Sequence, residues 1–243
     1  MALIVPDLGL LFIMAPHTGC TAIGEVLRDR FGATFVPPDD ILDAHGTIRV
    51  ARKHSRLPQL MEADLITPEQ RSGLVVAAGV RNPFDEEVSH FKQREREYRA
   101  RRDDASIRAR LAGDKAPAKS REQAAEVDFE TWLRRRYVAR PWHRLMGKAP
   151  KTPADFTAGA DMTIRFERLQ ADVDELFRRL GVAERVEIPV VNPTGVREKR
   201  PYQEFYTPRA RAIVEEVFAG RIARHGYTFE PASAVAVASR PSA

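Results

Sequence analysis

Cysteine is almost absent from this chain of 243 residues, and Cys20 is the only one. No internal disulfide can form, so a reducing compartment such as the cytoplasm is the expected location. Long apolar runs are also missing, and none approaches the roughly 20 residues of a membrane-spanning helix. The apolar start, MALIVPDLGLLFIMAPH, contains Asp7 and lacks a basic lead and a small-residue cleavage site. These absences favour a core segment over a signal peptide and a protein without a membrane span.

Several nucleotide and nucleic-acid motifs are missing as well. The common nucleotide-binding loop GxxxxGK[ST] does not occur, which removes the main support for a magnesium-dependent kinase or ATPase. Zinc-finger spacing and aromatic ribonucleoprotein motifs are absent too. Within a net charge of +5, positive residues do outnumber acidic ones between Lys92 and Arg121. A nucleic-acid-binding region over 92–144 therefore stays the minor alternative to a solvated helix face laced with opposite charges.

The composition is that of a globular protein, with 43% hydrophobic and 30% charged residues. The length suits one domain over residues 1–230. Residues 231–243 are rich in Ala, Ser and Val without a clear period, which predicts a flexible C-terminal tail.

Apolar runs alternate with helical patterns along the chain. The runs at 8–14 and 74–80 predict strands buried on both faces, and further short strands are expected at 34–36 and 162–166. Helices are expected from Cys20 to Gly32, from Pro83 onward, over 169–180 and from about 208 to 225. This alternation predicts an α/β fold with a mostly parallel central sheet flanked by helices.

The first strand-to-helix turn has the sequence PHTGCT, residues 16–21. A helix N-terminus presents unpaired N–H groups and a positive dipole end, Gly19 lets the backbone approach an anion, and Thr18, Thr21 and His17 add donors. Phosphate binding and a merely structural loop are equally supported by this turn alone. Cys20 at the helix start is an acidified nucleophile or a packing residue. Val26 stands where a cysteine phosphatase has arginine, which favours packing.

Four segments in the same order resemble the sulfotransferase family. VRNPFDEEVSHF, residues 80–91, resembles its 3'-phosphate-binding motif, because a serine, Ser89, follows the strand-terminal Arg81 by eight residues. PHTGCT is similar to its 5'-phosphosulfate loop, commonly PKTGTT. MTIRFERLQADVDELFRRLGV is similar to the family's later strand and helix, and the stretch from NPTGV to GYTF is similar to its C-terminal part. The resemblance runs from about residue 10 to 229.

The resemblance implies a three-layer P-loop-NTPase-like fold and metal-independent chemistry. The sulfuryl group of 3'-phosphoadenosine 5'-phosphosulfate would pass to a hydroxyl of a glycan, lipid or small metabolite. The nucleotide would be bound by two groups of residues in the two turns: His17, Thr18, Gly19, Cys20 and Thr21 in the first, and Arg81 and Ser89 in the second. The lack of a membrane anchor favours a soluble enzyme of the bacterial style over the Golgi arrangement.

Two departures from the family pattern affect this expectation. His17 stands where the family has the lysine that steadies the leaving phosphate, a role that a protonated imidazole can fill beside phosphates. Loss of that role would leave a non-catalytic protein that binds phosphoadenosine nucleotides, which is the main alternative. Glu86 stands where the motif often has arginine, and we expect it to serve structure or partner contacts.

The acceptor's proton needs a base, and His54 in RVARKHSRLP is the candidate, since some family members carry a histidine at this place. A surface histidine in a basic loop is the competing interpretation. Arg197, Lys199 and Arg200 are expected either near the 3'-phosphate or in a solvated loop. The identity of the acceptor does not follow from the sequence.

Overall fold

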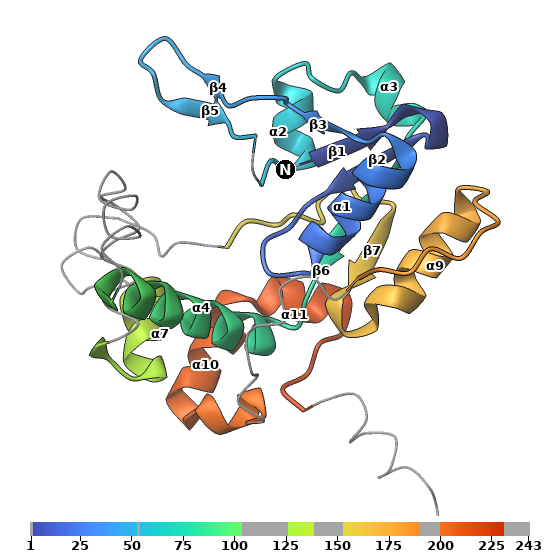
Figure 1. Cartoon of the computed structure of the whole chain (residues 1–243). Coiled ribbons are helices and arrows are strands. Elements are labelled where there is room, and N and C mark those ends of the chain that lie inside the picture. The colour runs from blue at the N-terminus through green and yellow to red at the C-terminus, as the bar shows by residue number, and fades with distance from the viewer. Residues whose placement is uncertain (1, 53, 104–125, 139–152, 190–199, 231–243) are drawn as a thin grey trace, which may run out of the picture. The chain divides into compact units, whose positions relative to one another are not determined.

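The computed structural model of the chain describes residues 2–52, 54–103, 126–138, 153–189 and 200–230 (Figure 1). The chain divides into two compact units, one of residues 1–81 with 154–197 and one of residues 82–153 with 198–243. Each unit has a hydrophobic core of its own. The expectation of a single domain over 1–230 stays a prediction, and the predicted tail lies outside the described residues.

The first unit contains a five-stranded sheet in the order β3-β1-β2-β6-β7. Its strands are β1 (Ala2–Val5), β2 (Leu10–Ile13), β3 (Thr34–Val36), β6 (Val75–Val80) and β7 (Met162–Arg165). β2, β6 and β7 run parallel, whereas β1 is antiparallel to both of its neighbours. The sheet is therefore mixed rather than mostly parallel.

The antiparallel strand arises from a reversal inside the apolar start of the chain. The 3-10 turn η1 (Pro6–Leu8) follows β1, and Gly9, at φ 57°, completes the turn with its N–H bonded to the carbonyl of Pro6. Proline at the first turn position and a residue with positive φ at the last favour such a reversal. One apolar stretch thus forms two paired strands.

Helices cover both faces of this sheet. Leu10 and Phe12 of β2 face α1 (Cys20–Phe31) and α9 (Leu169–Arg179) in one core cluster. Leu11 and Ile13 face α2 (Leu57–Glu62) in another. Side chains of this size each contribute about 1.5–3 kcal/mol when fully buried. The α/β class and the three-layer arrangement of the first unit are confirmed, while the P-loop-like fold rests on the resemblance.

A polar clasp joins the start of β6 to the start of β7. Arg71, on α3 (Pro68–Ser72), donates to the carbonyls of Leu74 and Gly159 and to the carboxylate of Asp161 at 2.7 Å. The same carboxylate accepts the N–H of Val76 at 2.8 Å. Burial raises the pKa of Asp161, but the hydrogen bonds from Arg71 and Val76 outweigh it and hold the pKa below its usual value.

The second unit is helical in its described parts. It contains α4 (Pro83–Asp103), α7 (Phe129–Tyr137), the 3-10 turn η3 (Tyr202–Phe205), α10 (Pro208–Val217) and α11 (Ala219–His225). Its core is rich in aromatic side chains, with Trp132 and Phe129 stacked and Phe91 edge-on to both. The single helix expected from about 208 to 225 is wrong: Phe218 leaves helical geometry at ψ 15° and packs its ring 5.6 Å from that of Tyr137.

The remaining local predictions hold within one or two residues. α1 ends at Gly32, which has φ 63°, and β6, β7 and α9 lie where their patterns placed them. The hairpin of β4 (Ile41–Leu42) and β5 (Ile48–Val50), like α2 and α7, was not predicted. Of the helices in the described ranges, none combines the length and the apolar character that crossing a bilayer requires.

Candidate functional site

Two loops leave the first unit's sheet at the same edge. β2 and β6 are neighbours and parallel, with Ile13 opposite Ala78, so residues 14–19 and Arg81 both follow the carboxyl ends of their strands. Ligands of open α/β sheets bind at such carboxyl ends. The sheet thus brings the first turn and Arg81, the first residue of the second turn, to the same edge.

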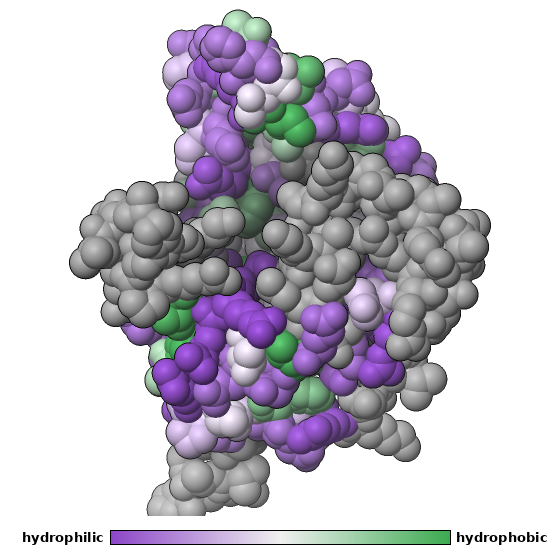
Figure 2. Space-filling view, turned by 90° about the vertical axis from the view of Figure 1, so that its left-hand side faces the viewer, coloured by the Kyte–Doolittle hydropathy of each residue, from purple (hydrophilic) through white to green (hydrophobic). Residues whose placement is uncertain are grey.

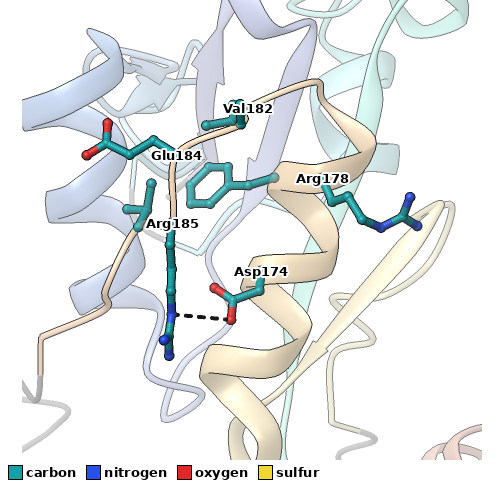
Figure 3. A pocket seen from close by; sticks show the side chains of 8 residues that line it. Asp174, Arg178, Val182, Glu184 and Arg185 are labelled. Atoms are coloured by element: carbon teal, nitrogen blue, oxygen red, sulfur yellow. Dashed lines mark ion pairs between the residues drawn. The ribbon is translucent and has the colours of Figure 1, made fainter.

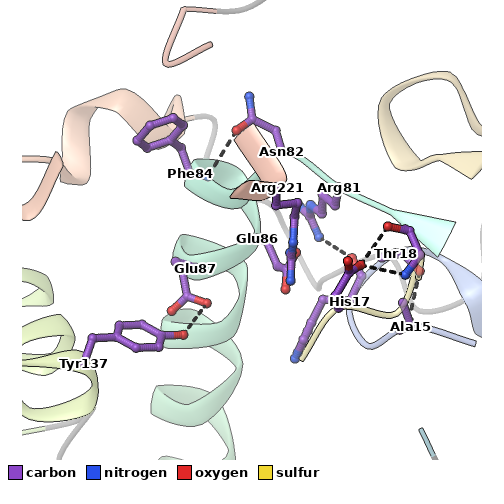
Figure 4. Close-up of polar contacts among 12 residues, drawn as sticks. Ala15, His17, Thr18, Arg81, Asn82, Phe84, Glu86, Glu87, Tyr137 and Arg221 are labelled. Carbon is purple, nitrogen blue, oxygen red and sulfur yellow. Dashed lines mark hydrogen bonds and ion pairs between the residues drawn. The ribbon is translucent and has the colours of Figure 1, made fainter. Parts of the chain in front are cut away.

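Thr18 is built into the first turn rather than exposed on it. Its side chain is buried at 2% exposure, and its hydroxyl donates to the carbonyl of Ala15 at 2.9 Å (Figure 4). A Cβ atom at Gly79 of β6 would lie 2.9 Å from the Cβ of Thr18, so only glycine leaves room for this packing. The hydroxyl of Thr18 therefore donates its one proton within the turn rather than to a ligand.

Arg81 braces the same turn. Its Nη1 donates to the main-chain carbonyl of His17 at 3.0 Å (Figure 4). Its guanidinium lies 4.0 Å from the ring centroid of Phe166. The side chain is 7% exposed. A guanidinium has five N–H donors in a fixed fork, a geometry that is suited to recognising an anion. The structure thus places Arg81 beside the first turn.

Two residues of the first turn, just before α1 begins, have positive φ angles. His17 has φ 61° and Gly19, the N-cap of α1, has φ 73°. Positive φ is uncommon outside glycine, so His17 is held in a costly conformation by its surroundings. Phe166 and Leu169 pack against Gly19, where a Cβ would lie 3.3 Å from each. This path directs the first N–H groups of α1 to the edge of the sheet, where they favour an anion.

Cys20 and Thr21 are the first two residues of α1, and they differ in their exposure to solvent. Thr21 is exposed, whereas Cys20 belongs to the core cluster beneath the turn. Burial raises the pKa of the Cys20 thiol above its usual value. A protonated, buried thiol is a poor nucleophile. The packing interpretation of Cys20 fits these observations.

His54 lies beside the first turn despite forty residues of separation. Its Nδ1 is 3.3 Å from the main-chain carbonyl of Met14, and its ring is edge-on to Phe156. A carbonyl only accepts, so this contact selects the tautomer with Nδ1 protonated and places the lone pair on Nε2. The imidazole is exposed and the residue has φ 64°. The structure therefore unites His54 with His17 and Arg81 in one unit.

Ser89 and Glu86 belong to the second unit. Ser89 is a half-buried residue of α4, and its joint contact with Arg81 on one phosphate stays a prediction. Glu86 forms a 2.5 Å ion pair with Arg221 of α11, which supports its expected structural role. Arg200 pairs with Glu204 at 2.9 Å, whereas Arg197 and Lys199 lie outside the described residues.

At the described start of the basic stretch, the positive side chains form ion pairs with acidic residues of the same helix. On α4, Glu95 pairs with Lys92 and Arg99, and Glu97 pairs with Arg94. Such pairs three and four residues apart are typical of a solvated helix face. They favour that interpretation over nucleic-acid binding for this part of the segment.

A buried carboxylate in the second unit was missed from the sequence. Glu87 is 1% exposed and accepts a hydrogen bond from the hydroxyl of Tyr137 at 3.0 Å (Figure 4). Its carboxylate also lies 3.8 Å from Nε of Arg136. Burial raises the pKa of Glu87 to about 7, and the charge of Arg136 offsets part of that rise. The sequence did contain a signal for this burial. Glu87 lies three residues after Phe84 and four before Phe91, so the three side chains share one face of the helix.

A shallow hollow of about 360 Å³ lies elsewhere in the first unit, between α9 and the segment 182–186 (Figure 3). Phe177 and Val182 line it together with Asp174 and Arg185, which are 3.9 Å apart. None of the predicted site residues lines it. It has no part in the candidate site.

Within the described ranges, no cluster of three or more His, Cys, Asp or Glu side chains could hold a metal ion. The candidate site therefore consists of main-chain donors, one guanidinium and two imidazoles at one edge of a sheet. Comparison of the chain with protein-family models, with curated proteins and with solved structures finds no match.

Proposed function

We propose that this chain is a sulfotransferase that moves a sulfuryl group from 3'-phosphoadenosine 5'-phosphosulfate to a hydroxyl acceptor. The observation that carries the proposal is the hydrogen bond from Arg81 to the carbonyl of His17 at 3.0 Å. It joins the two turns whose sequences resemble the family's 3'-phosphate and 5'-phosphosulfate motifs. Such turns serve a nucleotide with phosphates at both ends only when they lie together.

The donor groups fit a polyanion. The first turn and the start of α1 offer main-chain N–H groups and the Thr21 hydroxyl, and residues 14–24 contain no acidic side chain. Arg81 supplies a fork suited to a phosphate. Gly19, Cys20 and Thr21 would hold the 5'-phosphate mainly through the backbone, since the hydroxyl of Thr18 is used within the loop. The part of Ser89 rests on the resemblance alone.

The chemistry asks for positioning and charge stabilisation. In sulfuryl transfer the acceptor oxygen forms a bond to sulfur while the bond from sulfur to the leaving phosphate breaks, and the acceptor loses a proton. His17, when protonated, would stabilise the charge that builds on the leaving phosphate. His54 would take the acceptor's proton on Nε2, in the tautomer that the carbonyl of Met14 selects.

Calorimetry at low salt tests the nucleotide site. We expect 3'-phosphoadenosine 5'-phosphate to bind in the micromolar range, and adenosine 5'-phosphate, which lacks the 3'-phosphate, to bind at least about tenfold more weakly. Arg81→Lys keeps the charge but loses the forked geometry of the guanidinium. It should therefore weaken binding of 3'-phosphoadenosine 5'-phosphate and leave binding of adenosine 5'-phosphate unchanged. Arg178→Lys on α9 is the matched control. Absence of any binding would overturn the proposal, and equal affinities would remove the 3'-phosphate role of Arg81.

The main alternative is a protein that binds the nucleotide without transfer, and the histidine at position 17 is the observation that favours it. Labelled donor incubated with pools of glycans, lipids and small metabolites separates the two functions. Transfer of label to any pool supports the enzyme. Tight nucleotide binding with no transfer and no release of sulfate supports the alternative.

A further inference from the structure

Half of the described arginines of the first unit form an ion pair with a carboxylate. Ion pairs join Arg30 to Glu184, Arg71 to Asp161, Arg168 to Asp172, Arg178 and Arg179 to Glu175, and Arg185 to Asp174. Four arginines differ, because within the described part of the chain they make no ion pair: Arg28, Arg49, Arg52 and Arg56. We call these four the arginine surface.

Two members of the arginine surface meet on one aromatic ring. The Cζ of Arg28, on α1, lies 5.2 Å from the ring centroid of Phe35 on β3, and the Cζ of Arg52 lies 4.5 Å from the same centroid. Each contact is a favourable cation–π interaction. Two positive groups on one ring also repel each other, and a bound anion would relieve that repulsion.

Neutral partners hold the other two in place without removing their charge. Arg49 donates to the main-chain carbonyl of Glu62 at 3.2 Å, and Nε of Arg56 donates to the side-chain oxygen of Gln59 at 3.1 Å. The nearby carboxylates are bound to backbone N–H groups instead: Asp40 accepts from the N–H of Arg52, and Asp43 from two N–H groups of the β4–β5 turn. Figure 2 shows one face of the chain, on which hydrophilic residues predominate among the residues that are coloured.

The arginine surface flanks the candidate base. His54 lies two residues after Arg52 and two before Arg56, and it contacts the carbonyl of Met14 at the first turn. Arg28 lies on the helix that starts at the anion-binding turn, eight residues or about 12 Å along it from Cys20. Arg52 and Arg56 are therefore the described arginines nearest to the candidate base along the chain.

We propose that the arginine surface binds an anionic group of the acceptor, so that the substrate is a hydroxyl compound that also carries carboxylate, sulfate or phosphate. The proposal rests on the sulfotransferase function proposed above. Guanidinium groups bind planar carboxylates and tetrahedral oxyanions through paired N–H donors, which makes arginine suited to this selection.

A heparin-derived hexasaccharide, which carries carboxylates and sulfates, is the probe, with neutral chitohexaose as its uncharged counterpart. We expect the hexasaccharide to bind the full chain at low salt and chitohexaose not to bind. The double variant Arg28→Gln/Arg52→Gln should weaken hexasaccharide binding by at least about tenfold. The control Arg178→Gln/Arg179→Gln removes the same charge from α9 and should change binding by less than about twofold. Circular dichroism and the unfolding temperature check that both variants fold.

The outcomes separate the two proposals. No hexasaccharide binding, or equal losses in the two double variants, overturns the arginine surface. Tighter binding of a single-stranded oligonucleotide, lost in the same Arg28/Arg52 variant, overturns it in favour of nucleic acid. Absence of 3'-phosphoadenosine 5'-phosphate binding to the wild type would defeat the sulfotransferase function alone, because the hexasaccharide result is measured without nucleotide.

Discussion

The side chain of Thr18 lies against the bare Cα of Gly79, in the space where any larger residue at position 79 would place its Cβ. This contact fixes how closely the first turn packs against β6. Because the positions of the turn's main-chain donors depend on that packing, Gly79 supports the candidate site without touching a ligand.

Replacement of Gly79 by alanine should displace the turn. We expect Gly79→Ala to cost about 1–3 kcal/mol of unfolding free energy through overpacking. It should also weaken binding of 3'-phosphoadenosine 5'-phosphate. Gly220→Ala is the control, since a Cβ at that helical position meets nothing within 4 Å. Urea unfolding and calorimetry give both quantities, and equal effects of the two variants would contradict the proposed support.

His17 contributes to the loop through its carbonyl and to the proposed chemistry through its imidazole. Because the carbonyl remains in His17→Ala, we expect nucleotide affinity to change by less than about tenfold while turnover falls by about 100-fold or more. His17→Lys, which restores a cation, should keep turnover. Rates with labelled donor measure this, and a fully active alanine variant would exclude the catalytic role.

His54→Gln tests the base. A glutamine N–H can still reach the carbonyl of Met14, but an amide cannot take a proton, so turnover should be lost while donor binding persists. Turnover retained by the variant would move the base to another residue.

Glu87 predicts a pH dependence of stability. Its pKa of about 7 in the folded protein lies above the usual 4.5. Stability from the protonated form is therefore fully present below about pH 4.5 and is lost as the pH rises to about 7. Between these limits the wild type should lose on the order of 1–3 kcal/mol relative to Glu87→Gln. Urea unfolding at several pH values measures this.

The matched control for Glu87 is Glu215→Gln, which alters an exposed carboxylate on α10. Its pH dependence should parallel that of the wild type. If Glu87→Gln also parallels the wild type, then Glu87 ionises in the folded protein as it does in the unfolded chain.

Local patterns predicted the elements of the candidate site well. The apolar run that ends at Met14, the glycines Gly19 and Gly32 and the proline at position 83 are short-range signals, and each marks an element boundary within one or two residues. Two such strands side by side and parallel then place their loops at one edge.

Long-range packing explains most of what the sequence did not predict. The contacts of His54 with Met14 and of Glu87 with Tyr137 join residues 40 and 50 positions apart, and no local period encodes them. At the break between α10 and α11, the ring of Phe218 packs against that of Tyr137, a long-range contact that no local helical pattern encodes. The reversal at Gly9 did have a local signal, the proline and glycine that bracket η1.

The Arg71–Asp161 clasp lies at the amino ends of β6 and β7, while the candidate site lies at the carboxyl ends. The clasp and the proposed ligand site therefore lie at opposite ends of the same strands. Substitutions of Arg71 or Asp161 should alter the stability of the sheet without altering the proposed chemistry at the carboxyl ends of the strands. Such a separation lets a protein tolerate sequence drift in its scaffold while its reactive loops stay the same.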